Sequence, residues 1–373
     1  MSTIKVNTID NNGSNVDFPN KLKVRGNAIE QGYTASGTEP SSPSEGDYWW
    51  DSTNEILYQY INSEFKTISP PDPGFTWGGD RAIIAGGRDS SSTPLAIIDY
   101  YDITTTGNAS DFGDLTTART LCAACSSTER ALIMNGYYGS GTDTQTIDYL
   151  AIATLGNAAD FGDTLHDAIK ISCASDGTYG FHIGGQGITT STTGQIGRVT
   201  IATLGNSTDF GDLTTNADYT GSVYGASYVH VGGGDRGGYS NVIDYFATVV
   251  AGNASDFGDL TSAREEFDAC GDTTRGVWCG GRTSSSAGGV NIMDYVTLGT
   301  ASNATDFGDL TGARKVHACT SNETYGTING GLQSSTLQNQ IMYFTIQTTG
   351  NASDFGDLTQ TNNYMSACSG NAS

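Results

Sequence analysis

Short apolar runs separated by polar turns follow one another along most of the chain, and the same order of runs returns about every 49 residues. The clearest marker is the segment Gly107–Leu115, with the sequence GNASDFGDL. It occurs six times with small changes, and the steps between its Phe residues are 49, 49, 47, 50 and 48 positions. These residues are Phe112, Phe161, Phe210, Phe257, Phe307 and Phe355. A repeat of this length predicts a fold built from equivalent units.

Two further markers keep the same period. One is a short apolar run that ends in Gly-Gly or a close variant, as in Ile83–Gly87 and Leu132–Gly136. The other is Ile98-Asp99-Tyr100, which returns at residues 147–149, 243–245 and 293–295, is reduced to Met342-Tyr343, and is absent near Arg198.

Each unit has room for four short β-strands, which is typical of a propeller blade. In one unit we expect strands over Thr120–Cys125, Arg130–Asn135 and Thr146–Thr154, and a fourth around Phe161. The first strand is rich in small residues, which suits the crowded axis of a ring. Six copies of the markers predict an all-β, six-bladed propeller.

The two ends of the repeating region predict how the ring closes. The region begins at Asp80–Ile83, which matches the second strand of a blade but has no first strand before it. It ends at Ser366–Ser369, which matches the first strand of a blade but has no second strand after it. We therefore expect the C-terminal strand to complete the first blade, which removes the exposed sheet edges.

The Gly-Gly ending, the aromatic residue after the third strand and the Arg ahead of the first strand resemble the kelch repeat over residues 76–373. The resemblance implies a kelch-like propeller. The chain departs from the kelch pattern in one respect, because Phe of the DFGD motif stands where a late Trp is expected. The fold by itself does not assign a function.

Three segments precede the propeller. Residues 1–37 are polar, residues 38–69 predict a small β module with strands at 48–51, 55–60 and 65–68, and residues 70–75 form a proline-rich linker. Met1–Ile9 followed by Phe18–Val24 resembles the start of structural and tail-fibre proteins of marine, cyanobacterium-infecting phages. Pro43–Asp51, with Leu57-Tyr58 and Phe65, is similar to a short module in phage tail fibres. This resemblance implies an N-terminal virion-attachment segment and a displayed C-terminal domain.

Composition and charge narrow the function classes. The 373 residues include 50 Gly and only 15% charged residues, yet aromatic residues reach 10%, which indicates a folded all-β chain rather than disorder. The formal net charge of −23 disfavours nucleic acid and anionic membranes as partners. The apolar runs are too short for membrane insertion, and Met1–Lys5 lacks the core of a secretory signal. We therefore expect assembly in the host cytoplasm, and the resemblance to phage proteins implies a final place on a virion, the phage tail or surface.

No residue pattern predicts catalysis. We expect five cysteines to occupy the same place in the first strands of five blades, where small buried thiols suit the axis: Cys125, Cys173, Cys270, Cys319 and Cys368. His182 and His230 precede Gly-Gly and predict packing positions. Asp111 and Asp114, with Asn108 nearby, offer oxygen ligands for Ca²⁺ in each repeat. The alternative is that these side chains bind backbone amides in the turn, so no cofactor is assigned.

Antiparallel blades send alternate loops to opposite faces of the ring. One face receives the Asn-Ala-Ser-Asp turns and is expected to be acidic. The other receives loops that differ from blade to blade, typical of a binding surface on a rigid scaffold; the alternative is that they are solvated loops without a ligand. We expect ten ligand-binding residues there: Arg88, Arg119, Tyr137, Tyr138, Gln186, Arg236, Tyr239, Arg264, Arg282 and Arg314.

The sequence thus predicts a non-enzymatic phage virion protein, a tail-fibre or adhesin subunit that binds tail proteins through its N-terminus and a host glycan or protein through its propeller. By analogy with fibres, a homo-oligomer such as a trimer is expected. Two alternatives stay open. The propeller contacts only other virion proteins, as in a decorating or tail-assembly protein, or it is a glycan depolymerase with paired carboxylates.

Overall fold

The computed structural model describes residues 23–24, 27–28, 33–36, 38–44, 47–51, 56–61, 64–67, 79–139, 144–187, 191–285 and 288–372. The chain divides into two compact units, Met1–Phe75 and Thr76–Ser373. Among the described residues, no helix is long and apolar enough to cross a membrane.

The described residues of the first unit form two small sheets. Strands β1 (Lys23–Val24) and β2 (Asn27–Ala28) form a short antiparallel pair. A second sheet has the order β3-β4-β5-β6, with β3 (Tyr33–Ser36) parallel to β4 (Tyr48–Asp51), followed by β5 (Ile56–Ile61) and β6 (Glu64–Thr67). The last three strands match those predicted. The sheet also takes in β3, which lies in the segment assigned to virion attachment, and the buried Trp49 indole donates a hydrogen bond to the Ser36 carbonyl at 3.1 Å.

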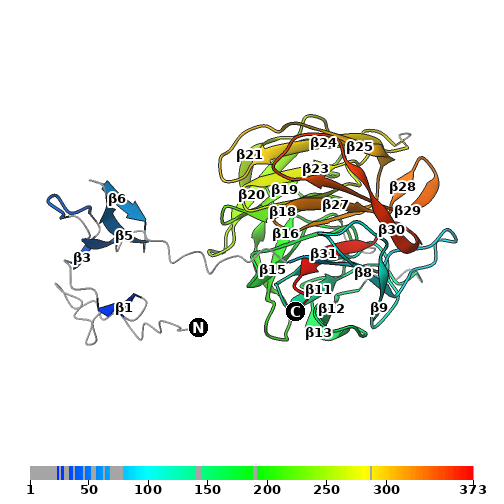
Figure 1. The fold of residues 1–373 in the computed structure, drawn as a ribbon, viewed down its shortest axis with the longest axis horizontal. Helices are drawn as coiled ribbons and strands as arrows, with labels where there is room; N and C mark the ends of the chain where they lie inside the picture. Colours follow the sequence, from blue (N-terminus) through cyan, green and yellow to red (C-terminus); the bar gives the residue numbers. More distant parts are fainter. Residues whose placement is uncertain are drawn as a thin grey trace. The chain divides into compact units, whose positions relative to one another are not determined.

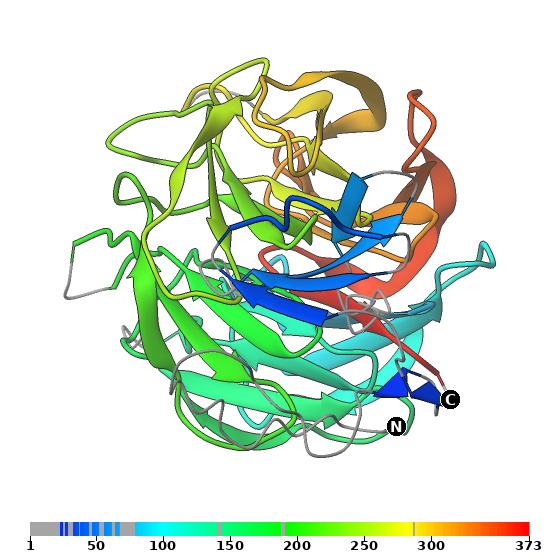
Figure 2. The same cartoon turned by 90° about the vertical axis from the view of Figure 1, so that its left-hand side faces the viewer.

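The second unit is a six-bladed β-propeller, as predicted, and its blades follow one another round a ring (Figures 1 and 2). Each blade is an antiparallel sheet whose inner strand contacts the inner strands of both neighbours. Blade 1 has β31 (Ser366–Gly370), β7 (Arg81–Ala85), β8 (Ile97–Asp102) and β9 (Ser110–Asp114). Blade 2 has β10 (Ala123–Ser126), β11 (Arg130–Met134), β12 (Thr146–Ala151) and β13 (Ala159–Asp163); blade 3 has β14 (Ser172–Ser175), β15 (Tyr179–Ile183), β16 (Gln195–Thr200) and β17 (Thr208–Asp212).

The other half of the ring repeats this order. Blade 4 has β18 (Gly221–Gly225), β19 (Tyr228–Gly232), β20 (Val242–Ala247) and β21 (Ser255–Asp259). Blade 5 has β22 (Asp268–Gly271), β23 (Arg275–Cys279), β24 (Val290–Thr297) and β25 (Thr305–Arg314). Blade 6 has β26 (Ala318–Ser321), β27 (Tyr325–Asn329), β29 (Thr336–Thr345) and β30 (Ser353–Asn362), and the short β28 (Leu332–Gln333) pairs with β29.

The ring closes through the C-terminal strand. β31 pairs with β7 over five residues, from Ser366 opposite Ala85 to Gly370 opposite Arg81. Figure 1 shows the red β31 among the cyan strands of the first blade. The predicted closure is therefore confirmed, and it lets the two ends of the repeat share one sheet.

A β-bulge explains the buried Phe of the repeated motif. In blade 1 the pairing of β8 with β9 shifts between Ile98 and Asp99, so Phe112 has no partner across the sheet. Its ring is 3% exposed and lies edge-on to Tyr100, with 5.8 Å between the ring centroids. The bulge thus turns the Phe inward while the flanking carboxylates remain exposed.

The same motif also joins neighbouring blades. The Asp114 amide donates to Asn157 Oδ1 of the next blade at 3.1 Å, and the Ala158 amide donates back to the Asp114 carbonyl at 2.8 Å. We call this two-bond contact the rim staple. It recurs at every joint, where the bonded pairs are Asp163–Asn206, Asp212–Asn253, Asp259–Asn303, Asp309–Asn351 and Asp357–Asn108.

The rim staple requires glycine beside it. Gly113 has φ +151°, and a Cβ there would lie 2.5 Å from the carbonyl oxygen of Gly156 in the next blade. The repeated motif is therefore a structural joint between blades.

The acidic groups of the repeated motif do not gather on one face of the ring, contrary to expectation. Asp111 and Asp114 belong to the outer strand β9 rather than to a turn on one face, and their copies occupy the outer strands of the other blades. Ten of these twelve residues are exposed, and Asp259 and Asp357 are half-buried, so the carboxylates place negative charge around the outer edge of the ring.

Candidate functional site

The variable loops gather on one face of the propeller. They are the loops between the second and third strands of each blade and those that lead from one blade to the next. We call this surface the loop face. Because the blades are antiparallel, it is opposite the loops that precede the outer strands.

Three of the ten candidate residues are not on this surface. Arg119, Arg264 and Arg314 are 0% exposed, so the expectation that they present guanidinium groups to a ligand is wrong. Arg119 and Arg264 form ion pairs with Asp148 at 3.2 Å and Asp294 at 2.9 Å. Arg314 donates to the Gly330 carbonyl at 3.2 Å and to Gln340 Oε1 at 2.9 Å.

The buried Asp of the Ile-Asp-Tyr marker is the centre of this arrangement. Asp148 also accepts hydrogen bonds from the amide and hydroxyl of Thr116 in the preceding blade, at 2.9 and 2.7 Å. It therefore joins two blades through a charge-assisted network. Threonine makes the same contacts with Asp99, Asp244 and Asp294.

A fourth candidate also belongs to this network. Blade 4 has Ala217 where Arg119 would be, and Arg236 reaches Asp244 from a loop at 2.7 Å. The side chain of Arg236 is only 6% exposed, so its loop position does not make it available to a ligand.

The other six candidates are partly exposed on the loop face. Two of them contact residues near the centre of the face. Arg88 lies over the ring of Tyr364 at 4.5 Å, and Gln186 accepts a hydrogen bond from Lys170 at 2.7 Å. The Tyr138 hydroxyl bonds Thr144 at 2.8 Å. The full set is Arg88, Tyr137, Tyr138, Gln186, Tyr239 and Arg282.

A ring of strained residues surrounds the end of the axis on this face. One residue before each inner strand has φ between 52° and 61°, a conformation that side chains rarely adopt. Backbone hydrogen bonds link five of the six neighbouring pairs round the ring, for example from the Lys170 amide to the Leu121 carbonyl. The six residues are Leu121, Lys170, Tyr219, Glu266, Val316 and Tyr364. Sequence reasoning missed this ring because no shared residue type marks it.

Charged groups gather on one side of this ring. Lys170 Nζ lies 3.7 Å from Asp218 and 4.5 Å from the ring centre of Tyr219. Arg282 pairs with Glu265 at 2.7 Å and with Glu266 at 3.1 Å. Lys315 approaches Glu266 at 3.2 Å.

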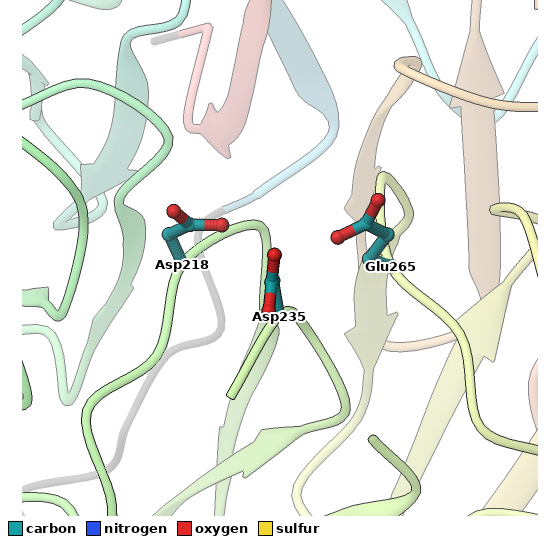
Figure 3. A group of neighbouring side chains, drawn as sticks. All are labelled: Asp218, Asp235 and Glu265. Carbon is teal, nitrogen blue, oxygen red and sulfur yellow. The ribbon is translucent and has the colours of Figure 1, made fainter. Parts of the chain in front are cut away.

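Three carboxylates meet within this network. Asp218, Asp235 and Glu265 come from three different loops, and one oxygen of each lies within 4.8 Å of the others (Figure 3). Burial raises the pKa of Asp218 to about 6, although Lys170 opposes the shift, and burial also raises the pKa of Glu265. Among the described residues, this is the group of three His, Cys, Asp or Glu side chains whose ligand atoms lie this close together. The Asp111/Asp114 repeats offer two carboxylates each, so their use as Ca²⁺ ligands stays a prediction.

The cysteines are not equivalent, contrary to expectation. Cys125, Cys270 and Cys368 pair with the third residue of the adjacent strand, whereas Cys173 and Cys319 pair with the fourth. The one-residue offset turns the side chains to opposite faces of the strand. Cys173 consequently meets Cys125 of the neighbouring blade, and burial raises its pKa. All seven cysteines are free thiols.

The histidines are packing residues. His182 and His230 are buried, as expected, and burial lowers the pKa of His182 to about 3 and of His230 to about 4. Burial also lowers the pKa of His317 to about 3.

His317 predicts a pH dependence of stability. The pKa of His317 is about 3 in the folded chain and about 6.5 in the unfolded chain. The contribution of neutral His317 to the free energy of unfolding is therefore fully present above pH 6.5 and is lost as the pH falls toward 3. The variant H317M has the residue that blade 1 carries at this position, Met365. Between pH 8 and pH 5, we expect the free energy of unfolding of H317M to rise by about 2 kcal/mol relative to that of the wild type. Urea unfolding at both pH values measures this, and an equal difference at both would contradict it.

No protein-family model matches the chain, and a search of curated proteins finds no match. The site must therefore be interpreted from its own geometry.

Proposed function

We propose that this protein is a non-enzymatic phage virion protein, a tail-fibre or adhesin subunit that is anchored by its N-terminus and binds a host-surface glycan through the loop face. The observation that carries the proposal is the contrast between two parts of the propeller. The outer edge repeats one motif at all six joints, whereas the loops of the loop face differ in every blade. Uniform joints with variable loops suit a rigid scaffold that presents a recognition surface.

The chemistry of the loop face favours a sugar. Aromatic side chains stand beside charged and amide groups there, as with Tyr219 beside Lys170 and Tyr364 beneath Arg88. Aromatic rings stack on the apolar faces of sugars while polar groups bond their hydroxyls. The net charge of −23 favours a neutral glycan over an anionic one.

The test measures binding of the labelled full-length protein to host cells. We expect saturable binding that periodate treatment of the cells abolishes and protease treatment leaves intact. Replacing Tyr239 by Ala should weaken binding about tenfold, as expected of an aromatic contact residue. The control is T154A, an exposed residue in a loop on the opposite face. Binding that survives periodate, or equal behaviour of the two variants, would contradict the proposal.

The structural alternative has its own test. Suppose that the propeller contacts only virion proteins. A phage whose copy of this protein lacks residues 76–373 should then lose particle assembly and infectivity equally. An adhesin predicts normal assembly and lost adsorption.

The enzymatic alternative has a candidate place on the loop face. A depolymerase needs two carboxyl groups roughly 5–10 Å apart, and Asp218, Asp235 and Glu265 bring three carboxyl groups close together there. Incubating the protein with host polysaccharide and following chain length by size-exclusion chromatography decides the matter, since shortening would support this alternative.

A further inference from the structure

We propose that Asp218, Asp235 and Glu265 bind a Ca²⁺ ion on the loop face. The inference does not depend on host recognition, since it concerns an ion held by this chain alone. Figure 3 shows the three carboxylates turned toward a shared space.

The backbone brings two like charges directly together. Asp218 and Asp235 form an isolated β-bridge, with reciprocal amide-to-carbonyl hydrogen bonds of 3.1 and 2.8 Å. Like charges in directly opposite positions destabilise a pair of strands. The corresponding bridges of the other blades carry no like-charge pair: they join Thr120–Tyr137, Ile169–Gln186, Glu265–Arg282, Lys315–Leu332 and Asn363–Arg88.

Each carboxylate has one oxygen engaged and leaves the other for an ion. Asp235 Oδ1 accepts the amides of Gly237 and Gly238, and Glu265 Oε1 accepts two hydrogen bonds from Arg282. Lys170 and Thr192 approach Asp218 Oδ2 at 3.7 and 3.5 Å. Asp218 Oδ1 is buried, in a residue only 3% exposed, and has no hydrogen-bond partner among the described residues. A buried acceptor without a partner is costly, and a cation would satisfy it.

The local charge balance also favours a cation. Four acidic side chains meet three basic ones here, which leaves one net negative charge among Asp218, Asp235, Glu265 and Glu266 against Lys170, Arg282 and Lys315.

The ligand set and its spread select the ion. Oxygen-only ligands suit Ca²⁺ or Mg²⁺ rather than softer metals. Opposite ligands of Ca²⁺ are roughly 4.6–5.2 Å apart, and those of Mg²⁺ about 4.2 Å or less. Oxygens within 4.8 Å of one another fall inside the spread of Ca²⁺ ligands, and carboxylates from three loops suit the flexible coordination of Ca²⁺ better than the strict octahedron of Mg²⁺. With three protein ligands, we expect a dissociation constant of about 0.1–1 mM.

The experiment is calorimetric titration of the full-length, EDTA-treated protein with CaCl₂ at pH 8. We expect one saturable site in that range, weakened at least tenfold by D218N and by E265Q. The control is D209N, an exposed Asp of the outer strand β17, which should bind within twofold of the wild type. MgCl₂ should bind more weakly than CaCl₂.

Thermal unfolding gives a second measurement. In the wild type, 10 mM CaCl₂ should raise the unfolding midpoint by about 2–5 °C, whereas D218N should show no shift beyond that of a MgCl₂ sample. Unfolding of D218N in EDTA with a wild-type-like transition establishes that this variant is folded. Equal Ca²⁺ binding by wild type and D218N, or no saturable site in the wild type, would overturn the proposal.

Discussion

Deleting residues 362–373 is expected to abolish cooperative folding of the propeller. The deletion removes β31, which supplies the inner strand of blade 1 and contacts the inner strands of blades 2 and 6. It also removes the buried Met365 and Cys368 and exposes the edge of β7. These losses together are comparable with the 5–15 kcal/mol that stabilises an ordinary domain. Far-UV circular dichroism with urea titration should therefore show no sharp transition.

The matched control is a shorter deletion. Removing residues 371–373 leaves β31 intact, and the hydrogen bond from the Asn371 amide to Thr128 is the described interaction that it loses. We expect its unfolding midpoint within a few degrees of the wild type. If the longer deletion melts like the full chain, the ring does not depend on this closure.

Replacing Arg264 by Met is expected to destabilise the protein by about 3–5 kcal/mol. The substitution leaves Asp294 buried and charged without its ion-pair partner, and an uncompensated buried charge costs that much. Asp294 would keep only the contacts from Thr261, at 2.6 and 3.3 Å. Urea unfolding at pH 7.5 gives the change in free energy.

A double-mutant cycle separates the pair from simple loss of packing. Blade 6 shows that Met is tolerated at the position of Asp294, because Met342 is there and Thr311 donates to its sulfur at 2.9 Å. The double variant R264M/D294M should be more stable than the sum of the two single effects predicts, by at least about 1 kcal/mol. Additive effects would mean that Arg264 acts through packing alone.

Much of the fold could be predicted because its determinants repeat. The period of Phe112 and the Gly-Gly runs indicated six blades, and the unmatched ends at Arg81 and Cys368 indicated the closing strand. The bulge at Phe112 and the rim staple could not be predicted, since they depend on contacts between blades that one repeat cannot show.

The candidate site was predicted less well. The position of Arg119 and Arg264 just before an inner strand predicts that both are exposed, yet each pairs with an Asp about 30 positions later in the same blade. The repeats show this pairing only in part. Blade 3 lacks both members and has Ala168 and Gly197 instead, but blade 4 keeps Asp244 without the Arg, and blade 6 keeps Arg314 without the Asp. The space beside Gly197 is filled by His182, which a Cβ would meet at 2.0 Å.

The rim staple has a consequence for how such a chain can evolve. Every joint uses the same two backbone amide donors, with an Asn Oδ1 and a backbone carbonyl as acceptors. The Asn and Gly that the joint requires lie in nearly identical stretches of sequence. A crossover between two of these stretches exchanges the loops of one blade for those of another and leaves a compatible joint on both sides. The repeated motif thus provides sites of homology at which the gene can reassort its variable loops while it preserves the ring.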